Sequence, residues 1–250
     1  MDYKKVKKLT KSALTKAKEL ILSSFFPRRC PLCDRVISYG SLICCDCEKK
    51  VPVIKEPLCK RCGKQLENER QEFCSDCSRK KHSYVQGKAV FSYEKEMKLS
   101  MYRFKYSNRR EYAEFYAEIA KKQYESWIAY RGIEAIIPVP LYSGKKRKRG
   151  YNQAEVFAVH LGKKCNIPVE KTIVNRIRNT VPQKELNDRQ RKDNLKGAFQ
   201  VKSNIVKYSI ILLVDDIYTT GATADAVADI LKKAGIAEVY ILSICIGQGC

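Results

Sequence analysis

The chain has 250 residues and a mass of 28.7 kDa, and 44% of its residues are hydrophobic, which is enough for one sizeable α/β domain and a small module. Lys and Arg outnumber Asp and Glu by 49 to 27, so the formal net charge of +22 favours partners such as phosphates, nucleic acid or an anionic membrane surface. No window reaches the roughly 18 consecutive apolar residues of a transmembrane helix, which argues against a membrane-spanning protein.

Residues 1–26 are predicted to form a basic amphipathic helix. Apolar residues recur there at helical spacing: Val6, Leu9, Ala13, Ala17, Leu20 and Ile21. We expect this helix to dock on the next module, and binding to a membrane surface is the alternative. Because the segment lacks the apolar core and cleavage site of a signal peptide, we expect a cytoplasmic protein, in which cysteines more often bind metal than form disulfides.

Residues 27–82 are predicted to form a double zinc-ribbon module. Eight cysteines form four Cys-x-x-Cys pairs whose spacing repeats: Cys30, Cys33, Cys44, Cys47, Cys59, Cys62, Cys74 and Cys77. Two such pairs can surround one tetrahedral Zn²⁺, and a closed shell of four thiolates has a structural role. We expect consecutive pairs to share an ion, while an interleaved pairing, a Cys45 in place of Cys44, and disulfides remain alternatives.

Residues 83–250 are predicted to form an α/β domain with a parallel sheet and helices on both faces, because strand-like and helix-like segments alternate. The expected strands are 88–93, 134–139, 172–176, 209–215 and 238–246. The expected helices are 109–130, 151–164 and 222–234. A doubly wound sheet of this kind binds ligands at the carboxyl ends of its strands.

The segment 209–231, SIILLVDDIYTTGATADAVADIL, predicts a buried strand that leaves through Asp215 and Asp216 into a polar turn before a helix. The turn contains Thr219, Thr220, Gly221, Ala222 and Thr223. Backbone N–H groups and threonine hydroxyls in such a turn can bind a phosphate dianion. The two carboxylates would repel that phosphate, so they suit a sugar diol, with Mg²⁺ nearby. The patterns GxxxxGK[ST] and GxGxxG are absent, and a helix cap with incidental acids is the structural alternative.

Two further segments are rich in cationic and amide side chains. The first, IIPVPLYSGKKRKRGYNQA (136–154), predicts a strand followed by a basic loop at 145–149, suited to pyrophosphate or a nucleic-acid backbone. Within it, Arg149, Asn152 and Gln153 have fixed donors that can orient a ligand. The second, RNTVPQKELNDRQRKDNLKGAF (178–199), is polar and has no clear periodicity. A solvated basic surface and a disordered loop are the structural alternatives for the two segments.

The stretch LLVDDIYTTGAT resembles the phosphoribosyl pyrophosphate binding motif of type I phosphoribosyltransferases. The resemblance implies a catalytic pair, Asp215 and Asp216, that holds the ribose hydroxyls, while 219–223 surround the 5-phosphate. It also implies that the loop after the strand at 134–139 binds pyrophosphate and that the polar segment 178–199 closes over the site. The residues carried over for these two loops are Pro140, Leu141, Tyr142 and Ser143, then Gln183, Arg189 and Asn194.

Together with FPRRCPLC (26–33), the segments 136–154 and 178–199 resemble the ComF family, specifically the ComFC-like proteins of natural competence. The resemblance covers the zinc module and the transferase-like domain. It implies a role in DNA uptake, with phosphoribosyl pyrophosphate and single-stranded DNA as ligands and a helicase-like competence protein as partner. Fifteen tyrosines suit base stacking, although tyrosine also packs in cores. The alternative is an active phosphoribosyltransferase, whose acceptor the residues do not identify.

Overall fold

The computed structural model describes residues 27–179, 195, 197–202 and 207–247. The chain divides into two compact units, Met1–Val51 and Pro52–Cys250. In the first unit, residues 27–51 form a cysteine-rich ribbon with a β-bridge between Arg29 and Val36 and the short helix α2 (Cys45–Glu48). The predicted helix at 1–26 lies outside the described residues, and so do Gln183, Arg189 and Asn194.

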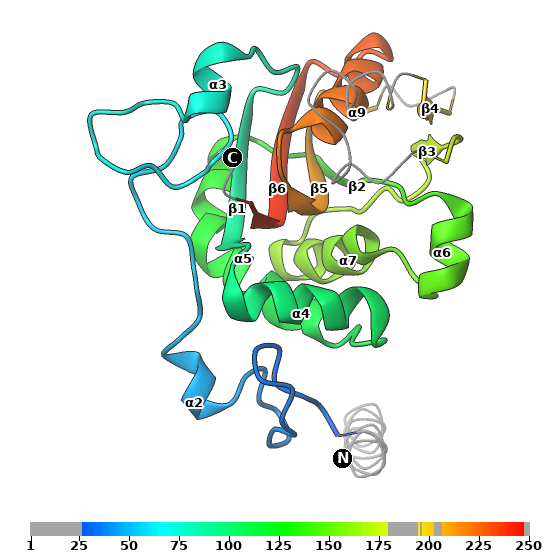
Figure 1. Cartoon of the computed structure of the whole chain (residues 1–250). Coiled ribbons are helices and arrows are strands. Elements are labelled where there is room, and N and C mark those ends of the chain that lie inside the picture. Colours follow the sequence, from blue (N-terminus) through cyan, green and yellow to red (C-terminus); the bar gives the residue numbers. More distant parts are fainter. Residues whose placement is uncertain (1–26, 180–194, 196, 203–206, 248–250) are drawn as a thin grey trace, which may run out of the picture. The chain divides into compact units, whose positions relative to one another are not determined.

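The second unit contains a four-stranded sheet in the order β1-β6-β5-β2 (Figure 1). Its strands are β1 (Gln86–Ser92), β2 (Ala135–Pro138), β5 (Ile210–Tyr218) and β6 (Glu238–Ile246). All neighbouring strands are parallel, so their carboxyl ends meet at one edge of the sheet. The predicted fold class, a parallel sheet with helices on both faces, is confirmed.

The helices of this unit follow the chain as α3 (Ser75–Arg79), α4 (Lys95–Tyr106), α5 (Tyr112–Tyr130), α6 (Ser143–Arg149), α7 (Gln153–Cys165) and α9 (Ala222–Lys233). Helices α5 and α7 pack on one face of the sheet and α9 on the other (Figure 1). Side chains of β5 alternate accordingly, because Ile211 and Leu213 join the buried cluster that contains Val227 and Leu231 of α9. Across the described part of the chain, no helix has the length and apolar character needed to cross a bilayer.

The structure corrects three predicted elements and adds one. The segment 172–176 contains β3 (Val174–Arg176), which pairs antiparallel with β4 (Phe199–Val201) and not with the main sheet. Strand β5 continues past Asp215 to Tyr218, because these residues keep their pairing with β6. The basic segment 145–149 is helical, since Lys and Arg favour helix and Gly150, at φ 79°, ends α6 in the left-handed conformation. Helix α4 is an element that the prediction lacks.

The second cysteine-rich segment packs against the outer edge of β1. The backbone N–H of Gly87 donates to the carbonyl of Arg61 at 2.6 Å, and Gln86 Nε2 donates to the carbonyl of Lys60 at 3.0 Å. Gly63, at φ 77°, lies so close that a Cβ there would be 2.8 Å from the Cα of Lys88. This close approach requires glycine, and it covers the first half of the outer edge of β1, whose second half pairs with Val53. The predicted boundary between the zinc-ribbon module and the α/β domain, at residues 82 and 83, stays a prediction.

Candidate functional site

Asp215 and Asp216 lie near the carboxyl end of β5. Successive side chains of a strand point to opposite faces, and Asp216 Oδ2 lies 2.8 Å from Nζ of Lys105 in α4. The Asp215 carboxylate accepts a hydrogen bond from the backbone N–H of Asp216 at 2.8 Å. Burial, together with the negative charge of Asp216, raises the pKa of Asp215 to about 7 despite this bond. The two carboxyl groups therefore differ, because Asp216 contacts a lysine, whereas the raised pKa of Asp215 lies near neutral pH.

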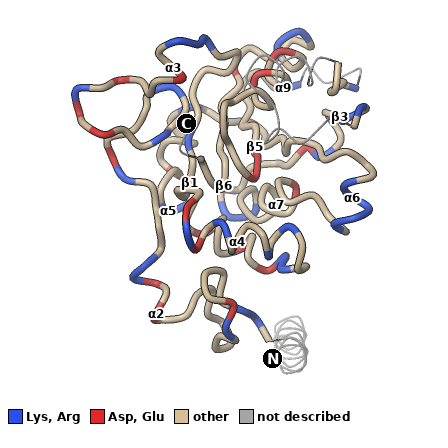
Figure 2. Tube along the Cα trace, in the orientation of Figure 1, with Lys and Arg blue, Asp and Glu red and all other residues tan. Residues whose placement is uncertain are grey.

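A cavity of about 220 Å³ opens beside the two acids, and we call it the cationic cavity. Among the residues that the structure describes, four basic side chains from three elements line it: Lys105 of α4, Lys145 and Arg149 of α6, and Arg176 of β3. Figure 2 shows Lys and Arg along α6. Lys145 and Arg149 are one helical turn apart, so both can face the cavity. Burial lowers the pKa of Lys145, and the charges of Arg176 and Arg149 lower it further, so a bound anion would relieve this repulsion.

The residues 219–223, which we call the threonine loop, join β5 to α9. Gly221 has φ 77° and stands at the N-cap of α9, where backbone N–H groups and the helix dipole favour an anion. Thr219, Gly221 and Thr223 line a second, smaller cavity. Asp215 and Thr223 line both cavities, which places the loop, the acids and the cations around one site. Such a site suits a hydroxylated molecule with phosphate groups at two ends.

The loop after β2 has two parts: its first residues line the cationic cavity, and its last residues begin helix α6. Pro140 and Leu141 line the cationic cavity. Tyr142 occupies the N-cap position of α6, and Ser143 is the first residue of that helix. Neither is among the residues that line the cavity in the described structure. Their predicted contact with pyrophosphate stays a prediction.

Asn152 and Gln153 line the same cavity, but their polar atoms hold the protein together. Asn152 Nδ2 donates to the carbonyl of Val139 at 2.9 Å, and its Oδ1 accepts from the N–H of Ala154 at 3.2 Å. It thereby caps α7 and ties that helix to the end of β2. Gln153 Oε1 accepts from Arg149 Nη1 at 3.2 Å. These contacts orient the loop and Arg149. Asn152 and Gln153 would therefore orient a ligand indirectly, through the loop and Arg149.

Two basic residues of the cavity are missing from the predicted site. Lys105 belongs to α4, whose buried Met97, Met101 and Phe104 recur at helical spacing and could have revealed it. Arg176 ends the segment 172–176, and a cation at the end of a predicted strand could have revealed it. Neither signal says that these residues reach Asp215 and Asp216, because that depends on tertiary packing.

A larger cavity of about 400 Å³ lies along α9, and its lining also includes Ser83, Leu195, Gly197 and Phe199. Its polar lining includes Lys80, Lys81 and Asp229. Neither Asp215 nor Asp216 lines it, and none of the four cations of the cationic cavity does. We therefore place the candidate site in the smaller cavity at the strand ends.

The eight predicted metal ligands form two clusters. Cys30, Cys33, Cys44 and Cys47 form the first cysteine cluster, and Cys59, Cys62, Cys74 and Cys77 form the second; within each cluster the sulfurs lie within 4.8 Å of one another. This is the sequential pairing, and exposed Cys45 belongs to neither cluster.

The sulfur geometry of both clusters fits a tetrahedral ion. The Sγ atoms of Cys33 and Cys44 are 3.7 Å apart, and so are those of Cys62 and Cys74. Thiolates about 2.3 Å from a tetrahedral Zn²⁺ are about 3.8 Å from one another. Disulfide-bonded sulfurs are only about 2.05 Å apart, so these pairs are not disulfides. The donor set and spacing support structural zinc in each cluster.

Two family models match the chain. The model described as "Double zinc ribbon domain" matches residues 21–78, and the model described as "Phosphoribosyl transferase domain" matches residues 151–248. The first match covers all eight clustered cysteines. The second covers the two acids and the threonine loop.

Curated relatives match along most of the chain. Competence protein F of Haemophilus influenzae is 30% identical over 88% of this chain and 97% of its own length. The DNA utilization protein YhgH of Salmonella typhimurium is 27% identical over the same shares. Competence protein ComFC of Streptococcus pneumoniae is 28% identical over 86% of this chain and 99% of its own length. Among solved structures, an adenine phosphoribosyltransferase of Saccharomyces cerevisiae matches at 12% identity with a TM-score of 0.35, over 58% of this chain and 73% of that chain.

Proposed function

The chain belongs to the ComF family of competence proteins, and from this premise we propose that it acts in natural competence by binding phosphoribosyl pyrophosphate and single-stranded DNA. The names of its relatives, which refer to competence and DNA utilization, support the cellular role. One observation supports the small ligand above others. A carboxylate pair stands between a phosphate-type loop and a cluster of four cations.

Each part of phosphoribosyl pyrophosphate has a chemically matching group in the site. The threonine loop offers N–H and hydroxyl donors for the 5-phosphate. Carboxylate oxygens of Asp215 and Asp216 accept hydrogen bonds from the ribose hydroxyls. Lys105, Lys145, Arg149 and Arg176 supply positive charge for the pyrophosphate.

Mg²⁺ would assist this binding. The ion prefers oxygen ligands and is commonly bound by one or two carboxylates together with phosphate groups. Asp215 and Asp216 are the carboxylates that line the cavity, so they would hold the ion either directly or through water. When bound, Mg²⁺ would neutralise charge on the pyrophosphate.

Calorimetric titration of zinc-replete protein with phosphoribosyl pyrophosphate and Mg²⁺ tests this proposal. We expect saturable binding, and we expect Asp216→Asn to weaken it at least about tenfold, because a charged hydrogen-bond acceptor is lost. Asp229→Asn is the matched control, since Asp229 is exposed on α9 and does not line the cationic cavity. If the unmodified protein did not bind phosphoribosyl pyrophosphate, the proposed ligand would be wrong.

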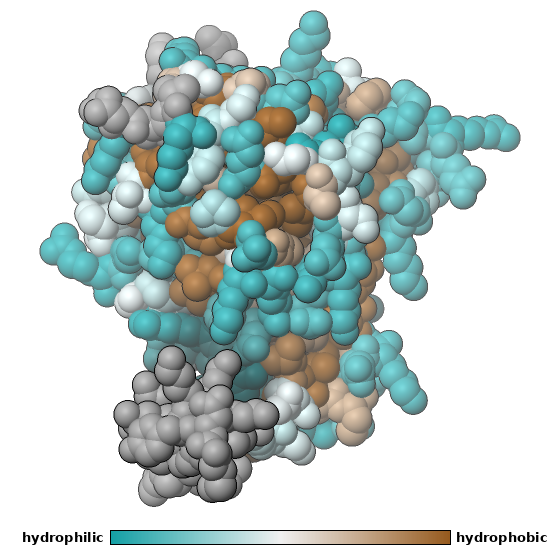
Figure 3. Space-filling view, turned by 180° about the vertical axis from the view of Figure 1, so that it is seen from behind, coloured by the Kyte–Doolittle hydropathy of each residue, from teal (hydrophilic) through white to brown (hydrophobic). Residues whose placement is uncertain are grey.

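The outer side of α4 supports the DNA part of the proposal. Tyr102 and Tyr106 are 60% and 55% exposed, and their ring centroids are 5.1 Å apart. Arg149 lies 5.2 Å from the centroid of the Tyr106 ring. Aromatic rings flanked by cations are the usual platform for unstacked bases. Figure 3 shows hydrophobic residues exposed among long hydrophilic side chains on one face of the molecule.

Fluorescence anisotropy with a labelled single-stranded oligonucleotide tests this surface. The double variant Tyr102→Ala, Tyr106→Ala should bind at least about 30-fold more weakly, because each of the two stacked bases contributes about 1–3 kcal/mol. Tyr130→Ala is the control, since Tyr130 is an 81% exposed tyrosine on α5. Affinity should also fall steeply with salt. Equal losses in both variants would exclude α4 as the platform, and a partner helicase stays a prediction.

Phosphoribosyl transfer is the second candidate function. The four cations that suit pyrophosphate as a ligand also suit it as a leaving group, because they stabilise the charge that develops as the bond to the ribose breaks. Release of pyrophosphate would then require an acceptor base or amine. Incubation with phosphoribosyl pyrophosphate, Mg²⁺ and a panel of acceptors should show acceptor-dependent release. Binding without any release would leave the ligand in a regulatory role.

A further inference from the structure

The second cysteine cluster is connected to the threonine loop by a buried histidine. The side chain of His82 is 0% exposed. Its Nε2 lies 3.5 Å from Sγ of Cys77, and its Nδ1 lies 2.9 and 3.1 Å from the two carboxylate oxygens of Asp225. Because an ionised carboxylate only accepts hydrogen bonds, Nδ1 is the donor in this contact. Asp225 is in the first turn of α9, directly after the loop.

The backbone next to His82 strengthens the same connection. The N–H of Ser83 donates to Oδ1 of Asp225 at 3.0 Å. Lys80 Nζ lies 3.2 Å from Oδ2 of Asp225 and 3.4 Å from the carbonyl oxygen of Thr220. The carboxylate of Asp225 thus receives the imidazole, an ammonium and a backbone donor from a single segment, residues 80–83. This segment follows directly after the last turn of the cysteine cluster.

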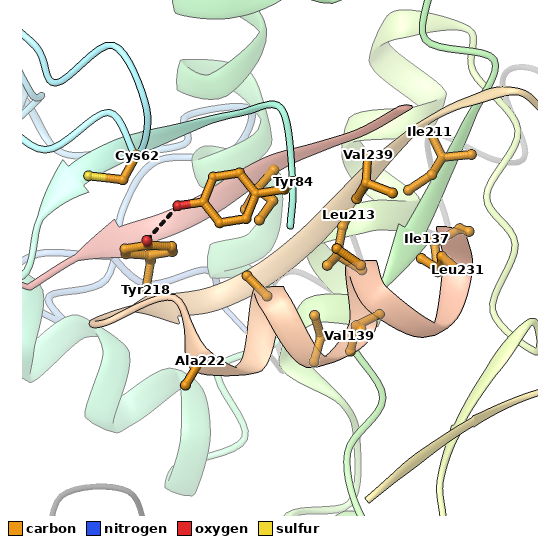
Figure 4. Close-up of a cluster of buried hydrophobic side chains, with 14 of the residues drawn as sticks. Cys62, Tyr84, Ile137, Val139, Ile211, Leu213, Tyr218, Ala222, Leu231 and Val239 are labelled. Carbon is orange, nitrogen blue, oxygen red and sulfur yellow. Dashed lines mark hydrogen bonds between the residues drawn. The ribbon is translucent and has the colours of Figure 1, made fainter. Parts of the chain in front are cut away.

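A tyrosine pair forms a second connection. The hydroxyl groups of Tyr84 and Tyr218 are 2.6 Å apart, and both side chains are buried (Figure 4). Tyr84 also stacks on His82, with ring centroids 4.8 Å apart. Tyr218 is the last residue of β5, so it fixes the other end of the threonine loop. Both ends of the loop therefore contact the segment that follows the second cluster.

Gly221 shows how tightly the loop is fitted against these side chains. A Cβ at this position would lie 2.4 Å from the hydroxyl of Tyr218 and 2.9 Å from Cε1 of His82. The bend of the loop thus lies directly on the histidine and the tyrosine. A shift of either side chain would free space beneath the bend.

We propose that the second cysteine cluster, through His82 and the Tyr84–Tyr218 pair, holds the threonine loop in the conformation that receives a phosphate. This inference deepens the proposed function and rests on it for the identity of the ligand. Zn²⁺ in the cluster would fix the turn around Cys77, and the segment 80–84 would transmit that order to the loop. A loop that is ordered before binding loses less conformational entropy when the ligand arrives. His82 is accordingly a positioning residue and not a ligand contact.

Amide hydrogen exchange tests the inference without any ligand. Cys59→Ser removes a buried ligand of the second cluster that is not the cysteine contacting His82. Cys30→Ser is the matched control, because Cys30 is the corresponding buried first cysteine of the first cluster. We expect exchange in residues 219–225 to accelerate at least about tenfold in Cys59→Ser and to be unchanged in Cys30→Ser. Equal exchange in the two variants would overturn the inference.

Loss of zinc in Cys59→Ser could unfold the second unit, so two further substitutions test the same connection without altering a cysteine. His82→Ala should retain the zinc content of the unmodified protein and still accelerate exchange in the loop. Tyr218→Phe should do the same, whereas Tyr124→Phe should not, although it also removes a buried tyrosine hydroxyl that makes a 2.6 Å hydrogen bond. Unchanged loop exchange in His82→Ala and Tyr218→Phe would refute the connection.

Ligand titration of the same variants separates this inference from the proposed function. If the unmodified protein binds phosphoribosyl pyrophosphate, His82→Ala should bind it about tenfold more weakly at equal zinc content. If the unmodified protein does not bind it, the ligand assignment fails, while accelerated exchange in the variants would still support the positioning role.

Discussion

Lys105 Nζ lies 2.8 Å from Asp216 Oδ2, so the candidate site contains its own counter-ion. Burial alone would lower the pKa of Lys105, but the charge of Asp216 and the hydrogen bond to it raise that pKa, and the lysine remains charged. The positive charge of Lys105 offsets the repulsion between the neighbouring carboxyl groups of Asp215 and Asp216. It also brings a cation from α4 to the edge of the sheet where the anion is proposed to bind.

Replacement of this cation should affect both stability and binding. Lys105→Met leaves Asp216 without its ammonium partner, so we expect a loss on the order of 2 kcal/mol in the free energy of unfolding. The affinity for inorganic pyrophosphate should fall about tenfold, because one of four cations is lost. Urea denaturation and calorimetry measure the two effects. Lys98→Met, at an exposed position of the same helix, should change neither quantity.

The raised pKa of Asp215 predicts a particular dependence of stability on pH. Its folded pKa of about 7 exceeds the value of about 3.9 in an unfolded chain, so the folded state retains a proton that the unfolded state has released. Stability therefore falls as the pH rises from about 4 to about 7. Asp215→Asn cannot ionise, so it should gain stability relative to the unmodified protein across this range, up to a limit of about 4 kcal/mol.

Denaturation of zinc-replete protein between about pH 5 and about pH 8 measures this difference. Asp229→Asn provides an exposed aspartate as control. A constant difference between Asp215→Asn and the unmodified protein at every pH would show that the carboxyl of Asp215 titrates normally. The affinity for a ribose diol should rise with pH over the same range, because the ionised carboxylate is the better acceptor.

The bend at Gly221 should tolerate no side chain. In Gly221→Ala the new methyl group meets the Tyr218 hydroxyl, and the left-handed backbone adds about 1–2 kcal/mol of strain, so we expect a total loss on the order of 3 kcal/mol. Gly132→Ala is the matched control, because Gly132 is also left-handed, at φ 61°, but a Cβ there meets nothing within 4 Å. Thermal denaturation compares them. Similar losses would mean that the clash is relieved and only backbone strain remains.

Zinc content should distinguish two adjacent cysteines. Cys44 belongs to the first cluster, whereas Cys45 is exposed and lies outside it. Elemental analysis should find the zinc content reduced by one ion per chain in Cys44→Ser, because a closed four-thiolate site loses a ligand. Cys45→Ser should keep the full content. If only Cys45→Ser lost zinc, Cys45 and not Cys44 would be the ligand, and the assignment of Cys44 would be wrong.

Much of this architecture follows from local patterns. The spacing of Cys-x-x-Cys pairs predicts two tetrahedral sites, since two residues between thiolates suffice to place both on one ion. The apolar run before Asp215 predicts a buried parallel strand, and the polar turn after it predicts the loop before α9. These features are predictable because the interacting atoms are a few residues apart in the chain.

Other features depend on contacts between distant segments, and only the tertiary structure decided them. The strand β3 pairs with β4 and not with the main sheet. The basic segment 145–149 is part of helix α6, which places Lys145 and Arg149 on the same face. Lys105 and Arg176 reach the acids from elements more than thirty residues away. His82 meets Asp225 across 143 positions of sequence. Residue type alone carries no information about such distances, because chain packing, and not local propensity, brings these side chains together.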